Sequence, residues 1–174
     1  MVQKRNTVAI LFLFIVICLS CLSSCDNYPQ DTYGTFEEVK GGTLLVGYAE
    51  NPPWVIASER ELAGIEVELI KGFAKSINAE IEWVNKNQHL LLEELEHRNL
   101  HFVISGLTKS TPWTSRVSVT GSFLEYQGQK HVIAVPPGEH RLLFELEDFL
   151  NEEEGAIPEL LNHYTGIEWY NLED

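Results

Sequence analysis

Cysteine is absent from the chain after residue 25. Only three of the 174 residues are cysteine, and Cys18, Cys21 and Cys25 all lie near the amino terminus. A domain built from the later residues therefore has no disulfide framework. The hydrophobic share of 44% is ordinary for a globular protein and supplies one packed core.

Basic residues are also scarce. The chain has 12 Lys and Arg against 26 Asp and Glu, and residues 25–174 keep ten of the cations and all 26 acids, a charge of −16. Such a surface repels phosphate backbones and anionic lipid headgroups. This excludes nucleic acid as a partner and predicts that the domain itself does not bind membranes.

A long apolar run is missing too. The one extended apolar stretch, residues 8–17, follows Lys4 and Arg5 and is itself followed by small residues. It is too short for a comfortable membrane span. The order of charged, apolar and small residues is instead typical of an export signal.

The end of this signal, LSSC at residues 22–25, resembles a bacterial lipobox. The resemblance implies a signal peptide over residues 1–24, cleavage before Cys25, and a diacylglycerol on its thiol with a fatty acid such as palmitate on its amine. Several acyl chains hold a protein at a bilayer. The predicted location is therefore the outer face of the cytoplasmic membrane, on the periplasmic side if there are two membranes. The alternative is a plain secretory signal that leaves a free Cys25 thiol.

Residues 26–42, DNYPQDTYGTFEEVKGG, contain few aliphatic side chains and are interrupted by Pro29, Gly34 and a glycine pair. This composition predicts a flexible tether over residues 25–42. The domain proper is expected over residues 43–155, with a helix and an acidic tail over residues 156–174.

Apolar periodicity predicts an α/β domain. Short apolar runs at residues 44–48, 80–84 and 100–105 are typical of buried strands, and helical spacing marks residues 65–77 and 91–95. Strands that alternate with helices through short joins pair in parallel with right-handed crossovers. Ligands of such sheets bind at the carboxyl ends of the strands. That rim carries ENPPW at residues 50–54 and GLTKSTPW at residues 106–113.

Four segments, taken in order, carry a resemblance to a known family. They are LLVGYAENPPWV, GIEVELIKGFAKSI, LEELEHRNLHFVISGLT and RVSVTGSF. Together they are similar to the first lobe of solute-binding proteins of family 3, the extracytoplasmic receptors that deliver polar amino acids to ABC importers. The resemblance covers about residues 43–123 and resumes near His131. It implies a single lobe of the type II periplasmic-binding-protein fold, with a mostly parallel sheet flanked by helices.

The segment TGSFLEYQGQKHVIAVPPG at residues 120–138 holds two apolar runs about seven residues apart. Receptors of this family leave the first lobe here, build a second lobe, and return through an adjacent strand. The sequence therefore predicts that the second lobe is missing and that a short turn through residues 127–129 joins the two strands. Residues 140–150 resemble the closing helix of the first lobe.

The resemblance also assigns solute-binding residues. It gives the solute's ring-stacking contact to Trp54 and its ammonium group to Thr108 and the backbone of Ser105 and Gly106, with Asn51 beside them on the rim. Two alternatives stay open, because Trp54 also suits a residue that covers the core and a glycine also suits a tight turn.

The family commonly has an arginine five residues after the threonine, where it grips a carboxylate. This chain has Trp113 there, and Arg116 lies about one helical turn further on. Arg116 is therefore a candidate carboxylate ligand, with a plain surface residue as the alternative.

No catalytic constellation, phosphate loop or metal-ligand spacing is present, and the prediction is a binding protein without a cofactor or metal. Three functions remain: a single-lobe solute-binding lipoprotein that binds weakly alone, an interaction module, and a truncated descendant that binds nothing. For the first, the expected partners are an ABC permease or a second protein that supplies the other lobe.

Overall fold

The computed structural model describes residues 29–58 and 61–166. The predicted signal peptide, the predicted lipidation site at Cys25 and the end of the acidic tail lie outside these residues. Within them, no helix combines the length and the apolar character that a membrane span requires.

A five-stranded sheet forms the centre of the fold, in the order β4-β1-β5-β9-β6. Strands β4, β1 and β5 run parallel, whereas β9 runs antiparallel to both β5 and β6. The predicted parallel strands are confirmed. The strands of this sheet are β1 (Thr43–Tyr48), β4 (Glu80–Asn85), β5 (Phe102–Ile104), β6 (Ser118–Val119) and β9 (Ala134–Val135).

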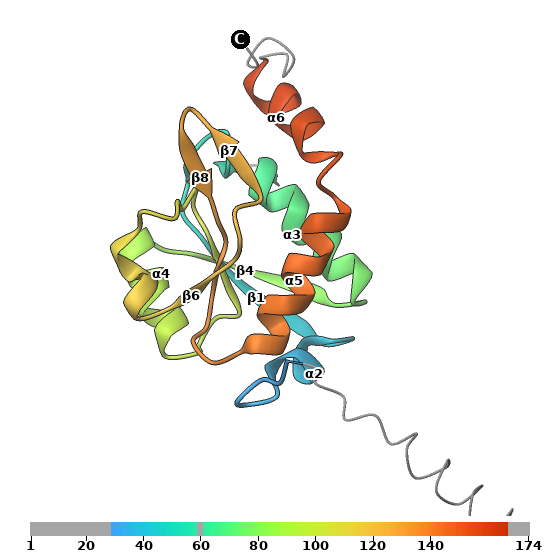
Figure 1. Ribbon diagram of the computed structural model, residues 1–174, viewed down its shortest axis with the longest axis vertical. Coiled ribbons are helices and arrows are strands. Elements are labelled where there is room, and N and C mark those ends of the chain that lie inside the picture. Colours follow the sequence, from blue (N-terminus) through green and yellow to red (C-terminus); the bar gives the residue numbers. More distant parts are fainter. Residues whose placement is uncertain (1–28, 59–60, 167–174) are drawn as a thin grey trace, which may run out of the picture.

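Helices cover both faces of this sheet (Figure 1). Residues of α3 and α5 pack against one face around Phe73 and Phe102, whose rings meet edge to face at 5.6 Å. Residues of α4 pack against the other face around Leu91 and Val103. The helices are α3 (Ile65–Ser76), α4 (Gln88–Glu96), α5 (His140–Glu152) and α6 (Ile157–Thr165), with a 3₁₀ turn η1 (Pro112–Ser115).

Two small hairpins complete the lobe. Strands β2 (Ile56–Ala57) and β3 (Leu62–Ala63) form the first, and β7 (Leu124–Tyr126) and β8 (Gln129–His131) form the second. The β7–β8 turn is the predicted one: Gln127 and Gly128 both have positive φ, at 52° and 72°, as a two-residue hairpin turn requires. The chain thus passes from β6 through this hairpin directly into β9, and forms one lobe.

The tether prediction is wrong for much of its length. Residues 35–39 form helix α2 (Thr35–Val39), and Phe36 and Val39 are buried in the same core as α3 and α5. Helix α6 also contributes Ile157 and Leu161 to this core, so the lobe extends beyond residue 155.

Asp31 fastens this amino-terminal segment to the rest of the lobe. Its Oδ1 accepts hydrogen bonds from the backbone N–H groups of Arg141 and Leu142, at 2.7 and 2.9 Å, in the first turn of α5. Its Oδ2 accepts from the N–H of Phe36 at 2.6 Å. One carboxylate therefore caps a helix that lies 110 residues away in the sequence.

We expect Asp31→Ala to lower the free energy of unfolding by about 2 kcal/mol, because three backbone donors lose a charged acceptor. Urea unfolding monitored by circular dichroism measures this change. The matched control is Asp148→Ala, which removes an exposed acid from α5. Equal stability of the two variants would contradict the role of Asp31 as a cap.

Candidate functional site

The loops that follow β1 and β5 meet at the carboxyl ends of the strands and form the rim. The Asn51 side chain donates a hydrogen bond from Nδ2 to the Ser105 carbonyl oxygen at 2.8 Å. Gly106 has φ of +67°, and a Cβ there would lie 2.4 Å from Asn51 Nδ2 and 2.5 Å from Trp54 Cδ1. Only glycine permits this approach, so the tight-turn interpretation of Gly106 is sound.

Glu66 lies beneath this turn. Its side chain is fully buried, and Oε2 accepts a hydrogen bond from the Gly106 N–H at 2.9 Å. The Glu66 N–H donates to the Trp54 carbonyl at 3.1 Å, so one residue of α3 holds both rim loops. Sequence reasoning missed it, because a glutamate in the first turn of a helix is ordinarily exposed.

Burial raises the pKa of the Glu66 carboxyl to about 8, and the Gly106 hydrogen bond only partly offsets that rise. The carboxyl is therefore largely protonated at neutral pH. Oε1 has no hydrogen-bond partner among the described residues. The Gly106 N–H is already used by Glu66, so the backbone of Gly106 can hydrogen-bond a solute only through its carbonyl.

Gln88, the first residue of α4, is a second residue that sequence reasoning missed. Its Nε2 lies 2.9 Å from the Ser105 Oγ. An amide nitrogen only donates, so the Ser105 oxygen accepts here and its hydroxyl hydrogen is left to donate elsewhere. The sequence indicates only that Gln88 follows Asn87, which caps the amino end of α4. It does not indicate that this end of α4 lies beside Ser105.

Trp54 does not present its ring to solvent. Its exposed fraction is 5%, and it belongs to the main core. The structure therefore places Trp54 in the position of a residue that covers the core, which was the alternative interpretation. Asn51, three residues earlier, is exposed, as are Glu50 and Pro52 on either side of it.

Trp113 and Arg116 lie further along the rim, on and after η1. The half-buried Trp113 ring meets the His89 ring edge to face at 5.2 Å. The Arg116 guanidinium lies 4.5 Å from the Trp113 ring centroid and forms an ion pair with Glu96 of α4. Arg116 is thus held toward α4, whereas Trp113 stays beside the amino end of that helix.

Thr108 is tied to its own loop. Its hydroxyl shares a hydrogen bond with the Ser110 hydroxyl at 2.8 Å, and its carbonyl accepts from the Thr111 N–H at 3.0 Å. Around Asn51, Ser105 and Thr108 the rim consequently offers amide, hydroxyl and carbonyl groups, and its charged residues are Glu50 and Lys109, both exposed. Such groups can hydrogen-bond the polar backbone of a zwitterionic solute.

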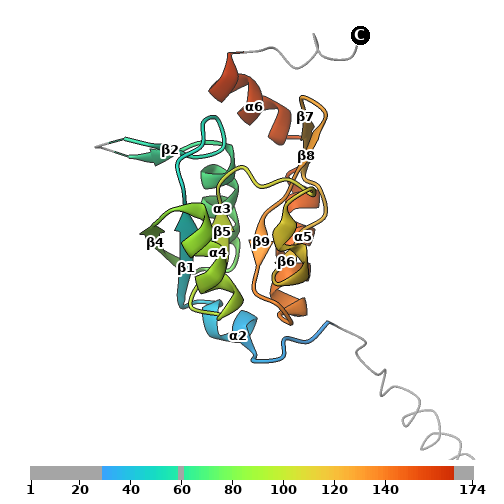
Figure 2. The same ribbon diagram turned by 90° about the vertical axis from the view of Figure 1, so that its left-hand side faces the viewer.

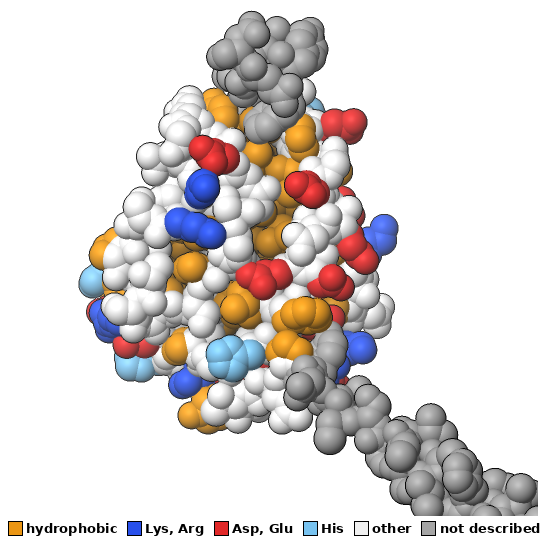
Figure 3. All heavy atoms as spheres, viewed as in Figure 1, with side chains coloured by type: hydrophobic (Ala, Val, Ile, Leu, Met, Phe, Trp, Pro, Cys, Tyr) orange, Lys and Arg blue, Asp and Glu red, His pale blue; other side chains and the backbone are white. Residues whose placement is uncertain are grey.

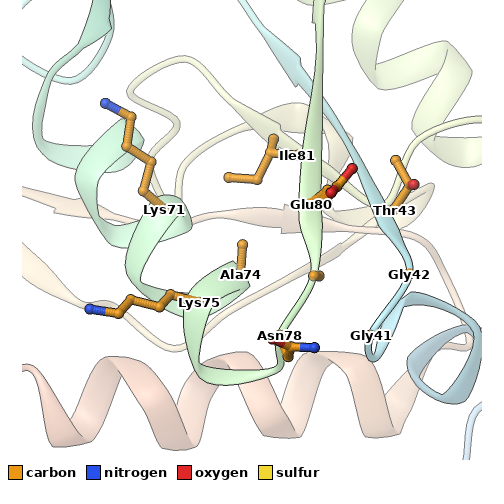
Figure 4. A pocket seen from close by; sticks show the side chains of 10 residues that line it. Gly41, Gly42, Thr43, Lys71, Ala74, Lys75, Asn78, Glu80 and Ile81 are labelled. Carbon is orange, nitrogen blue, oxygen red and sulfur yellow. The ribbon is translucent and has the colours of Figure 1, made fainter.

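A separate pocket of about 710 Å³ lies at the opposite end of the sheet (Figure 4). It is lined by the amino ends of β1 and β4, and the Lys71 and Lys75 side chains extend away from Thr43 and Glu80. Because parallel sheets bind ligands at the carboxyl ends of strands, this pocket is not the candidate site. Among the described residues, no group of three side chains is placed to hold a metal ion.

Comparison with profiles of protein families matches residues 44–166 to bacterial extracellular solute-binding proteins, family 3. A search of curated proteins finds no match. Among solved structures, the arginine-bound form of domain 1 from TmArgBP is 26% identical, with a TM-score of 0.61 over 67% of this chain and 97% of that one.

Two further structures share the fold. An ancestral amino acid-binding protein, a precursor of cyclohexadienyl dehydratase, is 14% identical with a TM-score of 0.67, over 75% of this chain and 98% of that one. An ancestral arginine-binding protein bound to arginine is also 14% identical, with a TM-score of 0.65, over 71% of this chain and 98% of that one.

The buried carboxyl predicts a pH dependence of stability. The pKa of Glu66 is about 8 in the folded protein against a usual 4.5, so the folded state retains a proton that the unfolded chain loses above pH 4.5. The free energy of unfolding should fall by roughly 4 kcal/mol as the pH rises from 4.5 to 8. Glu66→Gln, which keeps an acceptor for Gly106, should remove this slope, whereas Glu68→Gln should retain it. Urea unfolding at several pH values measures the difference, and an unchanged slope in Glu66→Gln would contradict the assignment.

Proposed function

Because the chain belongs to the bacterial extracellular solute-binding proteins, family 3, we propose that it is a single solute-binding lobe that holds small polar solutes of the amino-acid class at its rim. The family and the similar structures are binding proteins. The observation that carries the proposal is the crystal structure of domain 1 from TmArgBP in an arginine-bound form. In that protein, one lobe is enough to hold an amino acid.

The geometry of the rim supports the same solute class. Three polar groups lie around one turn: the exposed Gln88 side chain, the buried Ser105 hydroxyl to which it donates, and the carbonyl of the half-buried Gly106. A carbonyl accepts from a solute ammonium group, whereas a hydroxyl or amide donates to a carboxylate. The Trp113 ring at the side of this turn adds an apolar surface.

Binding by the lobe alone should be weak. Receptors with two lobes enclose their solute and close around a hinge, but this rim covers only one side of it and loses most of the burial on which small-molecule sites depend. Micromolar affinity requires about 8 kcal/mol, and half of that corresponds to millimolar affinity. Arg116 does not strengthen the site for carboxylates, since it pairs with Glu96.

The charge of the chain favours some amino acids over others. The formal net charge is −14, and acidic side chains gather over α5 in Figure 3. This field repels anionic solutes and attracts cationic ones. Arginine and lysine should therefore bind better than glutamate.

The export signal and Cys25 suggest how the rim is oriented. If Cys25 carries the lipid, the six peptide units between Cys25 and Asp31 span at most about 20 Å. Asp31 then lies within about 20 Å of the lipid-bearing residue. Helix α2 lies at the amino ends of the parallel strands, opposite the rim (Figure 2), and Asp31 is bonded to its Phe36 N–H. A lipid anchor would thus turn the rim away from the bilayer, where a second chain that supplies the other lobe can reach it.

We predict millimolar binding of arginine and lysine to the chain from residue 26 onward, with glutamate at least about tenfold weaker. Nuclear magnetic resonance titration to high solute concentration measures it, with shifts expected at Asn51, Gln88, Ser105 and Gly106. Gln88→Ala should weaken binding by about fivefold, the effect of one lost hydrogen bond.

The matched control is Gln129→Ala, which removes an exposed glutamine from the hairpin and should leave the affinity unchanged. Shifts confined to other surfaces would contradict the assignment of the rim. Absence of any solute binding would leave the interaction module or the truncated descendant as the function.

We also predict that Cys25 is lipidated. Cells that express the full chain and are fed labelled palmitate should yield a labelled protein in the membrane fraction, whereas Cys25→Ser should be unlabelled and soluble after export. Cys21→Ser should behave like the wild type. Labelling that survives Cys25→Ser would rule out this anchor.

A further inference from the structure

The β7–β8 hairpin places a histidine on the ring of Trp54. The two ring centroids lie 3.6 Å apart and the ring planes differ by 24°, so the rings stack face to face. Both side chains have an exposed fraction of 5%. Sequence reasoning gave His131 no role, because 77 residues separate it from Trp54 in the chain.

Two more aromatic rings of the same segment complete the enclosure. The rings of Phe123 and Tyr126 meet Trp54 edge to face, with centroid distances of 6.3 and 6.1 Å. The indole is therefore surrounded by side chains of residues 123–131. In a two-lobed receptor, the chain would leave the lobe and re-enter it at this point. Here residues 123–131 occupy that position.

Backbone hydrogen bonds fix His131 against the rim. The Val132 N–H donates to the Leu107 carbonyl and the Lys109 N–H donates to the Lys130 carbonyl, both at 2.9 Å. These two bonds flank the pair Thr108 and His131, which lie opposite each other. Side chains of such a pair lie on the same face of the ladder. His131 consequently projects beside Thr108, within the predicted solute site.

The imidazole is held by ring packing rather than by polar contacts. Its Nδ1 is buried and has no hydrogen-bond partner among the described residues. Burial also lowers the pKa of His131 to about 4. The His131 ring is therefore neutral, and its Nδ1 is left without a hydrogen bond. Stacking on the face of Trp54 explains why the ring is nevertheless held in this position.

We propose that His131 is a specificity-determining residue that occupies the ring face of Trp54 in place of a solute side chain. The inference rests on the proposed binding of amino acids at the rim. With His131 in place, arginine cannot lay its planar guanidinium on the indole, although this is the contact that such a face provides best. The wild-type rim therefore recognises the groups that all amino acids share and distinguishes their side chains only by charge.

The test compares arginine with glycine, which has the shared groups but no side chain. In the wild-type chain the two dissociation constants should agree within about fivefold, since only the long-range field separates them. In His131→Ala the affinity for arginine should rise by about tenfold while that for glycine stays the same. His131→Phe restores a ring on Trp54 and should resemble the wild type. His140→Ala, at an exposed position on α5, is the matched control.

A second readout does not depend on solute. In chains with Trp83, Trp113 and Trp169 replaced by phenylalanine, acrylamide quenching reports the exposure of Trp54 alone. His131→Ala should increase the quenching constant severalfold, and His131→Phe should not. Thermal unfolding of each variant verifies that the lobe is folded.

The outcomes separate the two proposals. If neither amino acid binds any variant but His131→Ala exposes Trp54, the proposed function fails and the shielding by His131 stands. If the wild type binds and His131→Ala leaves the arginine to glycine ratio unchanged, the function stands and the specificity role is overturned. Unchanged quenching in a folded His131→Ala chain would overturn the shielding as well.

Discussion

Strand β9 is the element on which the rest of the lobe depends. It lies between β5 and β6, and each of its two neighbours bonds to it antiparallel. The sheet is continuous only because the chain that leaves β6 comes back as β9, through a hairpin whose turn is two residues long. In a two-lobed receptor a whole domain fits between these strands. Here the hairpin brings the end of β6 and the start of β9 close enough to pair, and Ile133 and Val135 are packed in the core.

The hairpin that closes the sheet also changes the rim. Its backbone pairs with residues 107–109, and its aromatic side chains enclose Trp54. Glu66 supports the same loops from below through Gly106. The Ser105–Gly106 turn of the rim is therefore held between a buried carboxyl and a hairpin, and the groups of this turn are polar and uncharged.

The sheet and main helices could be predicted from the sequence because their patterns are local. Apolar runs and helical spacing identify β1, β4, β5 and α3 without knowledge of any partner. Helix α2 could not be predicted in this way, since five residues with three buried side chains are too short to show a period. Its burial depends on Asp31 and on α5, more than 100 residues away.

The candidate site, too, depends on contacts between distant segments. The order of the segments was enough to predict that Asn51, Ser105 and Gly106 lie on the rim. The directions of side chains were not predictable, because they are set by contacts between distant segments. Trp54 turns inward under His131, and Arg116 turns toward Glu96. Gln88 enters the site only because α4 begins beside the end of β5.

If one lobe, closed by a hairpin, binds a solute at the carboxyl ends of its parallel strands, bound solute should protect the backbone there from hydrogen exchange. We would measure backbone hydrogen exchange with and without a saturating concentration of arginine. We expect slower exchange in residues 49–54, 86–90 and 105–113, with no change in α2 or around the pocket at the amino ends of β1 and β4. Protection confined to that pocket, or no protection anywhere while the lobe is folded, would contradict it.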